Sequence, residues 1–240
     1  KAFFEKRKRK RFTEFESIQI MRERNYFGSM MVNQGDADSM ITGLTKNYRS
    51  TLRPVLQTIG LKKGVNVAAG MYILITKKGP MFLADTTVNR NPSAEEIAEI
   101  TINVAKTIKR LRVVPIVSLL SYSNFGSSPG DDPKKMAKAI SIIHKAEPDL
   151  IVDGEMQANF ALNKELLNEK FPFSLLSKKE ANTLIFPNLS SGNISYKLMQ
   201  QITDGDAIGP ILIGLNKPVH VLQLGCSVRE IVNMVKVSVI

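Results

Sequence analysis

The sequence predicts an α/β protein built on mostly parallel sheets. Short apolar runs of strand length alternate with stretches whose apolar residues recur at helical spacing, a pattern typical of βα units. Polar segments rich in Ser, Asn and Gly follow several of these runs, as expected of loops at strand ends. With 240 residues, 43% of them hydrophobic, the chain can bury a sizeable core in one large domain or two small ones.

The first clear elements are a hairpin and a helix. Residues 72–76 and 81–84 are strand-like, and the turn sequence Lys77-Lys-Gly-Pro between them predicts a hairpin. The sequence Ser93-Ala-Glu-Glu96 is a capping box, which predicts a helix start. Apolar residues at helical spacing continue this helix through residues 97–111.

The rest of the chain continues the alternation. Further strands are expected at residues 114–120, 150–152, 182–186 and 211–213. One further helix is expected to start with Asp132 as N-cap and Pro133 at N1. Two more are expected around residues 160–168 and from the end of the 188–193 loop through residue 198. A last helix is expected from Ser227, which forms a second capping box with Glu230.

The charge of the chain is uneven. The formal net charge is +11, and residues 1–11 contain seven Lys or Arg and a single Glu, so more than half of the excess lies there. The chain has no Trp and 7% aromatic residues, which gives no obvious stacking platforms for bases, so no nucleic-acid partner is expected. The basic run is expected to be a solvated or partner-facing helix end, although Arg7, Arg9 or Arg11 could reach a phosphate.

A reducing, cytoplasmic setting fits the cysteine content, because Cys226 is the only cysteine and no intrachain disulfide is possible. The sequence has no signal peptide and no apolar run of about twenty residues, so no membrane contact is expected. The chain begins at Lys1 without a Met and is interpreted as a fragment whose N-terminal part is missing.

Three polar loops predict a site for an anionic, phosphate-bearing ligand. They are residues 42–49, which carry Lys46 and Arg49, residues 121–128, and residues 188–193; Arg53 lies one turn beyond the first. Strand-end loops and helix N-termini offer unpaired N–H groups to anions. The alternative is that Ser, Asn and Gly only form the turns. Neither a P-loop nor a dinucleotide-binding glycine motif is present.

Other candidate sites are weaker. The pairs Asp36 with Asp38 and Asp153 with Glu155 could offer carboxylates to a metal, but the chain has only two His and one Cys, so no metal site is expected. Cys226 is expected to be a packed thiol, and His144 and His220 are expected to be structural.

Nine short motifs follow one another along the chain. They are Phe27-Gly-Ser-Met-Met-Val, Gly35-Asp-Ala-Asp, Ala84-Asp-Thr-Thr-Val-Asn, Ser121-Tyr-Ser, Asp153-Gly-Glu, Phe186-Pro-Asn, Gly192-Asn-Ile-Ser-Tyr-Lys, Ile208-Gly-Pro-Ile-Leu and Gly225-Cys-Ser. In this order they resemble the phosphate acetyltransferase (phosphotransacetylase) family from about Arg7 to the C-terminus. The resemblance implies a three-layer αβα fold of two α/β lobes with a cleft between them, residues 1–63 with 212–240 and residues 64–211.

Three segments are similar to one branch of that family, the C-terminal transacetylase-like domain of hybrid NADP-dependent malic enzymes. They are Ser123-Asn-Phe-Gly-Ser-Ser, Lys217-Pro-Val-His-Val-Leu and Ser227-Val-Arg-Glu-Ile-Val-Asn-Met. The resemblance implies acetyl-CoA as an allosteric effector and a homo-oligomer as the assembled form. It also implies malate-oxidising domains on the parent chain, with NADP and a divalent metal in those absent domains.

The catalytic positions of the family are altered. Active members carry an Arg where this sequence has Gln201, and a Ser-Arg pair where it has Gln223-Leu224. They carry an Asp where it has Glu230, which stays a possible base, although its simpler role is the capping box. Loss of two charge-assisted contacts predicts a rate lower by about a thousandfold, while binding can survive.

The expected function is therefore regulatory binding of acetyl-CoA. Two arginines are expected to contact the ligand: Arg53, which keeps the arginine of the family motif Thr-Leu-Arg-Pro, and Arg7, which falls where the family places another arginine. The alternatives are an active phosphate acetyltransferase that interconverts acetyl-CoA and acetyl phosphate, and a domain that only assembles the parent enzyme. The residues expected to hold the ligand are Arg53, Lys46, Arg49, Arg7, Ser121, Ser123, Asn124, Gly126, Ser127, Asn193 and Gln223.

Overall fold

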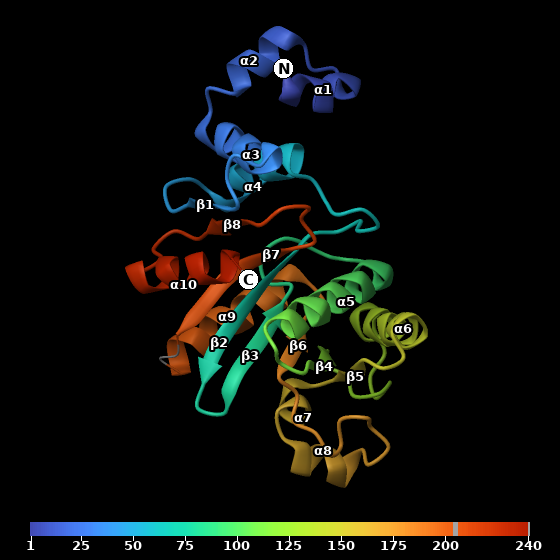
Figure 1. Ribbon diagram of the computed structural model, residues 1–240. Coiled ribbons are helices and arrows are strands. Elements are labelled where there is room, and N and C mark those ends of the chain that lie inside the picture. Colours follow the sequence, from blue (N-terminus) through green and yellow to red (C-terminus); the bar gives the residue numbers. More distant parts are fainter. Residues whose placement is uncertain (204–205, 240) are drawn as a thin grey trace. The chain divides into compact units, whose positions relative to one another are not determined.

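The computed structural model describes residues 1–203 and 206–239, and the chain divides into two compact units (Figure 1). Unit 1 comprises Lys1–Val65 and Pro210–Ile240, and unit 2 comprises Asn66–Gly209. Both ends of the chain thus belong to unit 1, and unit 2 is formed by one continuous segment.

Unit 1 is mainly helical around a small parallel sheet. Its elements are α1 (Ala2–Arg7), η1 (Lys8–Lys10), α2 (Glu14–Ile20), α3 (Arg24–Gln34), β1 (Met40–Gly43), α4 (Tyr48–Thr58), β8 (Val219–Leu222) and α10 (Val228–Ser238). Strands β1 and β8 pair in parallel, with Met40 opposite Val219 and Gly43 opposite Leu222. Neither strand was expected from the sequence, in which His220 only marked an apolar run.

Unit 2 carries the large sheet. Its elements are β2 (Ala69–Thr76), β3 (Gly79–Ala84), α5 (Ala94–Arg110), β4 (Ile116–Leu120), α6 (Asp131–Ala146), β5 (Ile151–Met156), α7 (Ala158–Ala161), α8 (Lys164–Lys170), β6 (Thr183–Ile185) and α9 (Leu189–Thr203). The strand order is β5-β4-β6-β3-β2-β7, with β7 spanning Ala207–Ile213. The pairs β3–β6, β6–β4 and β4–β5 are parallel, which confirms the expected mostly parallel α/β class.

Helices cover the sheet of unit 2. Helix α6 packs on α5, β4 and β5, and α5 also contacts β3, while α9 lies against β2 and β3. The ring of Tyr196 in α9 stacks on Tyr72 in β2, with centroids 4.0 Å apart. The tyrosines belong to a buried apolar cluster with Leu83, Leu184 and Met156.

Several sequence predictions are confirmed. Strands β2 and β3 form the expected antiparallel hairpin. Both expected capping boxes are present, with Ser93 starting α5 and Ser227 starting α10. The two histidines are held within the fold, because a ring nitrogen of His144 lies 3.0 Å from the Val152 carbonyl and His220 is buried in β8.

Two predictions at helix starts are wrong. Helix α6 begins at Asp131 with Gly130 as N-cap, so Asp132 lies inside the helix. The carboxylate of Asp132 instead forms an ion pair with Lys135, 2.8 Å apart, one turn further on. The single helix expected around residues 160–168 is two short helices, α7 and α8, because the Asn163 side chain caps a new helix start.

Candidate functional site

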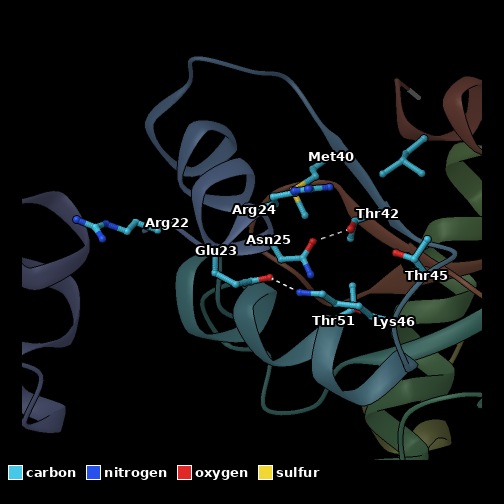
Figure 2. Close-up of a pocket in the computed structure, with 11 residues that line it drawn as sticks. Arg22, Glu23, Arg24, Asn25, Met40, Thr42, Thr45, Lys46 and Thr51 are labelled. Atoms are coloured by element: carbon cyan, nitrogen blue, oxygen red, sulfur yellow. Dashed lines mark hydrogen bonds and ion pairs between the residues drawn. The ribbon is translucent and has the colours of Figure 1, made fainter. Parts of the chain in front are cut away.

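A pocket of about 610 Å³ opens in unit 1 where β1 ends and α3 begins (Figure 2). Basic side chains, hydroxyl groups and one carboxylate surround it. The lining residues are Arg22, Glu23, Arg24, Asn25, Met40, Ile41, Thr42, Gly43, Thr45, Lys46 and Thr51. Of the residues expected to bind a ligand, Lys46 lies directly in this lining.

The close pairing of β1 with β8 shapes one wall of the pocket. Gly43 has φ +119°, and a Cβ atom there would lie 2.3 Å from the carbonyl oxygen of Leu222. Only glycine allows this approach. The loop that follows ends at Asn47, whose side chain accepts a hydrogen bond from the Ser50 N–H and so caps α4. Thus β1, its loop and the start of α4 are fixed beside the pocket.

Helix α3 is tied to the same strand by a buried amide. The Thr42 hydroxyl donates to Oδ1 of Asn25 over 2.7 Å, a contact drawn in Figure 2. Asn25 is buried, so its oxygen needs such a partner inside the protein. This bond holds the first turn of α3 against the end of β1.

An ion pair crosses the pocket. The Nζ atom of Lys46 lies 2.8 Å from Oε1 of Glu23, and Figure 2 shows the two side chains pointing toward one another. The other oxygen of Glu23 accepts a hydrogen bond from the N–H of Tyr26 over 3.3 Å and so caps α3. The side chain of Arg22 extends away from the other labelled residues in the same view.

Two of the predicted arginines act electrostatically on Tyr26. Burial raises the pKa of Tyr26 above its ordinary value, and the guanidinium groups of Arg53 and Arg7 act against that rise. The Tyr26 hydroxyl donates to Oε1 of Gln57, one turn beyond Arg53 on α4. Arg7 also lies over the Phe12 ring, with 5.8 Å between the guanidinium carbon and the centroid.

Three of the predicted cations of unit 1, Lys46, Arg53 and Arg7, thus interact with residues at the start of α3. The backbone of Tyr26 contacts Glu23, which holds Lys46, while the hydroxyl of the same tyrosine lies within electrostatic reach of Arg53 and Arg7. Arg49 is exposed one turn before Arg53 on α4. Positive charge concentrated on one surface favours anionic ligands.

The predicted serine loop of unit 2 is tied to a buried carboxylate. Oε1 of Glu155 accepts the hydroxyl of Ser123 over 2.9 Å and the N–H of Gly126 over 2.7 Å. The Ser123 oxygen also accepts the N–H of Ser128 over 3.0 Å. Both Ser123 and Glu155 are fully or almost fully buried, so these groups hold the loop in shape.

Other predicted residues of unit 2 also make internal bonds. The hydroxyl of Ser127 accepts the N–H of Asn124, and Oδ1 of Asn124 accepts the N–H of Gln157. Oγ of Ser121 accepts the N–H of Ser123 over 3.4 Å. The amide of Asn193 donates to the carbonyl of Thr86 over 3.1 Å. Gly126 is exposed, but its backbone N–H is held by Glu155, and the N–H groups of its neighbours in the loop are bonded within the protein as well.

A second pocket, of about 570 Å³, lies in unit 2 beyond the ends of β3, β4 and β6. Nζ of Lys135 lies 2.8 Å from oxygens of both Asp132 and Asn91, and Asn188 donates to the other Asp132 oxygen over 3.2 Å. This network ties three strand-end loops together. The lining residues are Arg90, Asn91, Tyr122, Asp131, Asp132, Asn188 and Ser190.

The positions at which the family resemblance implies catalytic residues are mostly open to solvent. Gln201 is exposed in the last turn of α9, Leu224 is 67% exposed, and Gln223 is half-buried. The carboxylate of Glu230 accepts the N–H of Ser227 over 2.6 Å, as its expected capping role requires. The chain thus places neutral side chains where the family resemblance implies arginines.

Several pocket residues were missed by sequence reasoning. Arg22 precedes a helix that the sequence did not reveal, and Arg24 and Asn25 form the start of that helix. Asn25 meets Thr42 only in the folded protein. The Glu23 position was detectable as an N-cap just before the apolar stretch of α3, although glutamate is an uncommon cap.

One of the two carboxylate pairs considered for a metal, Asp153 with Glu155, is engaged in hydrogen bonds within unit 2. One Asp153 oxygen accepts the hydroxyl of Ser174 and the N–H of Leu175. Within residues 1–203 and 206–239, no group of three or more His, Cys, Asp or Glu side chains is placed to hold a metal ion. In the same ranges, no helix combines the length and the apolar character needed to cross a membrane.

The fold and the basic pocket define an α/β protein with a surface suited to an anionic ligand. The sequence profile of the phosphate acetyl/butaryl transferase family matches residues 1–239. The chain belongs to this family.

Individual relatives agree with that assignment. A phosphotransacetylase from Streptococcus pyogenes superposes with a TM-score of 0.92 at 38% identity, over 99% of this chain and 72% of that one. A phosphate acetyltransferase of Clostridium acetobutylicum is 38% identical over 99% of this chain and 73% of its own length. An NADP-dependent malic enzyme of Haemophilus influenzae is 42% identical over 98% of this chain. The chain spans only 31% of that malic enzyme.

Proposed function

We propose that the chain is a transacetylase-like regulatory domain that binds acetyl-CoA and does not turn it over. The observation that carries the proposal is the gathering of Lys46, Arg53 and Arg7 around the start of α3. Acetyl-CoA carries a diphosphate and a further phosphate group, so a surface rich in guanidinium and ammonium groups suits it.

The altered catalytic positions support binding without turnover. Transfer of an acetyl group between phosphate and a thiol requires a base near the thiol and cations on the phosphate. Gln201 and Leu224 supply no charge, and the carboxylate of Glu230 is engaged in the start of α10. Two missing charge-assisted contacts correspond to a rate lower by about a thousandfold.

The relatives support a role within a larger enzyme. NADP-dependent malic enzymes are 42% identical to this chain, and it spans 31% and 28% of two of them. In this proposal, acetyl-CoA bound here biases malate oxidation by catalytic domains on the parent chain, where NADP and a divalent metal act. The assembled form is a homo-oligomer in the cytoplasm.

Two measurements on the 240-residue chain test the proposal. Calorimetric titration with acetyl-CoA is expected to show saturable heat at millimolar ligand or below. A coupled assay for acetyl-CoA formation from CoA and acetyl phosphate is expected to stay at background. Absence of binding heat at millimolar acetyl-CoA would contradict the proposal.

The second candidate is an active phosphate acetyltransferase. The observation in its favour is 38% identity with a phosphate acetyltransferase over 73% of the length of that enzyme, together with the retained Arg53. In this case Glu230 would leave its capping bond to serve as base. Turnover well above background in the coupled assay, lost in Glu230→Gln, would favour this second function.

A further inference from the structure

The basic pocket of unit 1 already contains an anion of its own. Of the eleven residues that line it, Glu23 is the sole acid, whereas Arg24 and Lys46 are basic, and the basic side chain of Arg22 extends away from the others. The glutamate therefore lies where the surrounding positive charge favours an anionic ligand.

Both oxygens of this carboxylate are used. Oε1 contacts the Lys46 ammonium over 2.8 Å, and Oε2 accepts the N–H of Tyr26 over 3.3 Å. An ammonium and a backbone N–H at a helix start are also the groups that a phosphate oxygen takes as partners. The Glu23 carboxylate thus binds the same kinds of donor that a phosphate group would bind.

We propose that Glu23 is a tethered competitor that a phosphate group of the ligand displaces, and that it makes the pocket select phosphate and diphosphate groups over carboxylates. The inference rests on the proposed function, since it concerns the same basic surface. When the ligand binds, its phosphate takes over the contacts to Lys46 and to the start of α3, and the Glu23 side chain turns toward solvent.

The balance of forces allows this exchange. The side chains of Lys46 and Glu23 are 54% and 32% exposed, and ion pairs as exposed as this contribute little to stability. A phosphate group carries up to two negative charges and three acceptor oxygens, against one charge on the carboxylate. A free carboxylate offers no such advantage over Glu23, which is held at high effective concentration by its covalent attachment.

Inorganic diphosphate is the probe that tests the inference, with affinities measured by calorimetry at fixed ionic strength. Glu23→Gln is expected to raise the affinity roughly three- to tenfold, because it releases Lys46. Glu14→Gln is the matched control, since Glu14 is an exposed acid in the first turn of α2, outside the pocket lining. It removes the same charge and is expected to change the affinity less than about twofold.

Two further variants separate displacement from general electrostatics. In a Lys46→Met background, Glu23→Gln is expected to give no gain, because the carboxylate acts through the ammonium. Glu23→Asp keeps the charge and is a good helix cap, but its shorter side chain withdraws from Lys46, so a smaller gain is expected. If Glu23→Gln does not fold, Glu23→Asp still tests the inference, because aspartate keeps the cap of α3.

Equal affinities for diphosphate in the wild type, Glu23→Gln and Glu23→Asp would overturn the inference, as would a gain that persists without Lys46. Failure of diphosphate to bind any variant would also overturn it. A parallel titration with acetyl-CoA distinguishes an error in the role of Glu23 from an error in the proposed function. If acetyl-CoA binds and these variants do not alter diphosphate binding, only the role of Glu23 is wrong; if acetyl-CoA does not bind, the proposed function is wrong.

Discussion

The guanidinium group of Arg53 on α4 lies within electrostatic reach of the Tyr26 hydroxyl on α3. Burial raises the pKa of this phenol, and Arg53 opposes the rise because a nearby positive charge favours the phenolate. Arg53 therefore acts on a residue at the same helix start where Glu23 holds Lys46. The effect of Arg53 on the pKa of Tyr26 can be measured without any ligand.

Replacing Arg53 by Ala is expected to raise the pKa of Tyr26, because the opposing positive charge is removed. NMR of ring-labelled tyrosine during an alkaline titration would follow the phenol, with Tyr26→Phe assigning the signal. Arg110→Ala, which removes an exposed arginine at the end of α5 in unit 2, is the control and should leave this titration unchanged. An identical Tyr26 titration in Arg53→Ala would show that the two groups are not close.

The carboxylate of Glu155 is expected to stabilise unit 2. Its removal in Glu155→Ala leaves the Ser123 hydroxyl and the Gly126 N–H without their acceptor, at a cost of roughly 2–4 kcal/mol. Ser123→Ala should cost about 1–2 kcal/mol. Chemical denaturation measures both.

The control for this pair is Ser141→Ala on the exposed face of α6, where the hydroxyl bonds only within its own helix. Its expected cost is within about 0.5 kcal/mol. If Glu155→Ala were as mild as this control, the loop of residues 121–128 would not depend on the carboxylate.

His220 predicts a loss of stability in acid. Burial lowers its pKa from 6.5 to about 4, and its Nδ1 accepts the N–H of Leu212 over 3.2 Å, which requires the neutral ring. In the unfolded chain His220 is protonated below about pH 6.5, whereas in the folded chain it stays neutral down to about pH 4. Stability therefore falls as the pH drops through this window, by roughly 3 kcal/mol in all, and this group adds no further loss below it.

Denaturation at a series of pH values from 7 to 4 checks the His220 prediction. His220→Asn keeps an acceptor near the Leu212 N–H but cannot titrate, so the dependence in this window should shrink. His144→Asn replaces the only other histidine and should retain the dependence. A steep acid loss that survives in His220→Asn would assign it to carboxylates instead.

Gly43 should not tolerate a side chain. Gly43→Ala combines a positive φ of +119° with a Cβ atom 2.3 Å from the Leu222 carbonyl, so the pairing of β1 with β8 must open. The expected cost is roughly 2–5 kcal/mol in chemical denaturation. Gly35→Ala has a φ of +90° with no atom within 4 Å, so it carries only the backbone cost of about 1 kcal/mol. Equal costs for the two variants would argue against the close approach.

Local signals in the sequence predict unit 2 well. The hairpin of β2 and β3 and the capping box at Ser93 depend on residues close together in the chain, so short-range chemistry specifies them. Asp132 is misread as an N-cap because aspartate suits that position, whereas the folded protein uses it to bind Lys135 and Asn188. Tertiary contacts there prevail over local preference.

The pocket of unit 1 is harder to predict, because it joins segments far apart in sequence. The pairing of β1 with β8 brings Met40 opposite Val219, and two strands of four residues give a weak alternation signal. Lys46 is predictable from its loop, but its partner Glu23 lies 23 residues earlier and is recognised only in the fold.

The most direct test of the account is calorimetric titration of the 240-residue chain with acetyl-CoA, using wild type, Arg53→Ala and the Arg110→Ala control. The wild type is expected to show saturable binding, Arg53→Ala to weaken it by roughly 1–3 kcal/mol, or about 5- to 150-fold, and Arg110→Ala to bind as the wild type does. Absence of heat from the wild type at millimolar acetyl-CoA would contradict binding of acetyl-CoA by this chain. Unchanged affinity in Arg53→Ala would contradict binding at the basic surface of unit 1, because the ligand would then lie away from it.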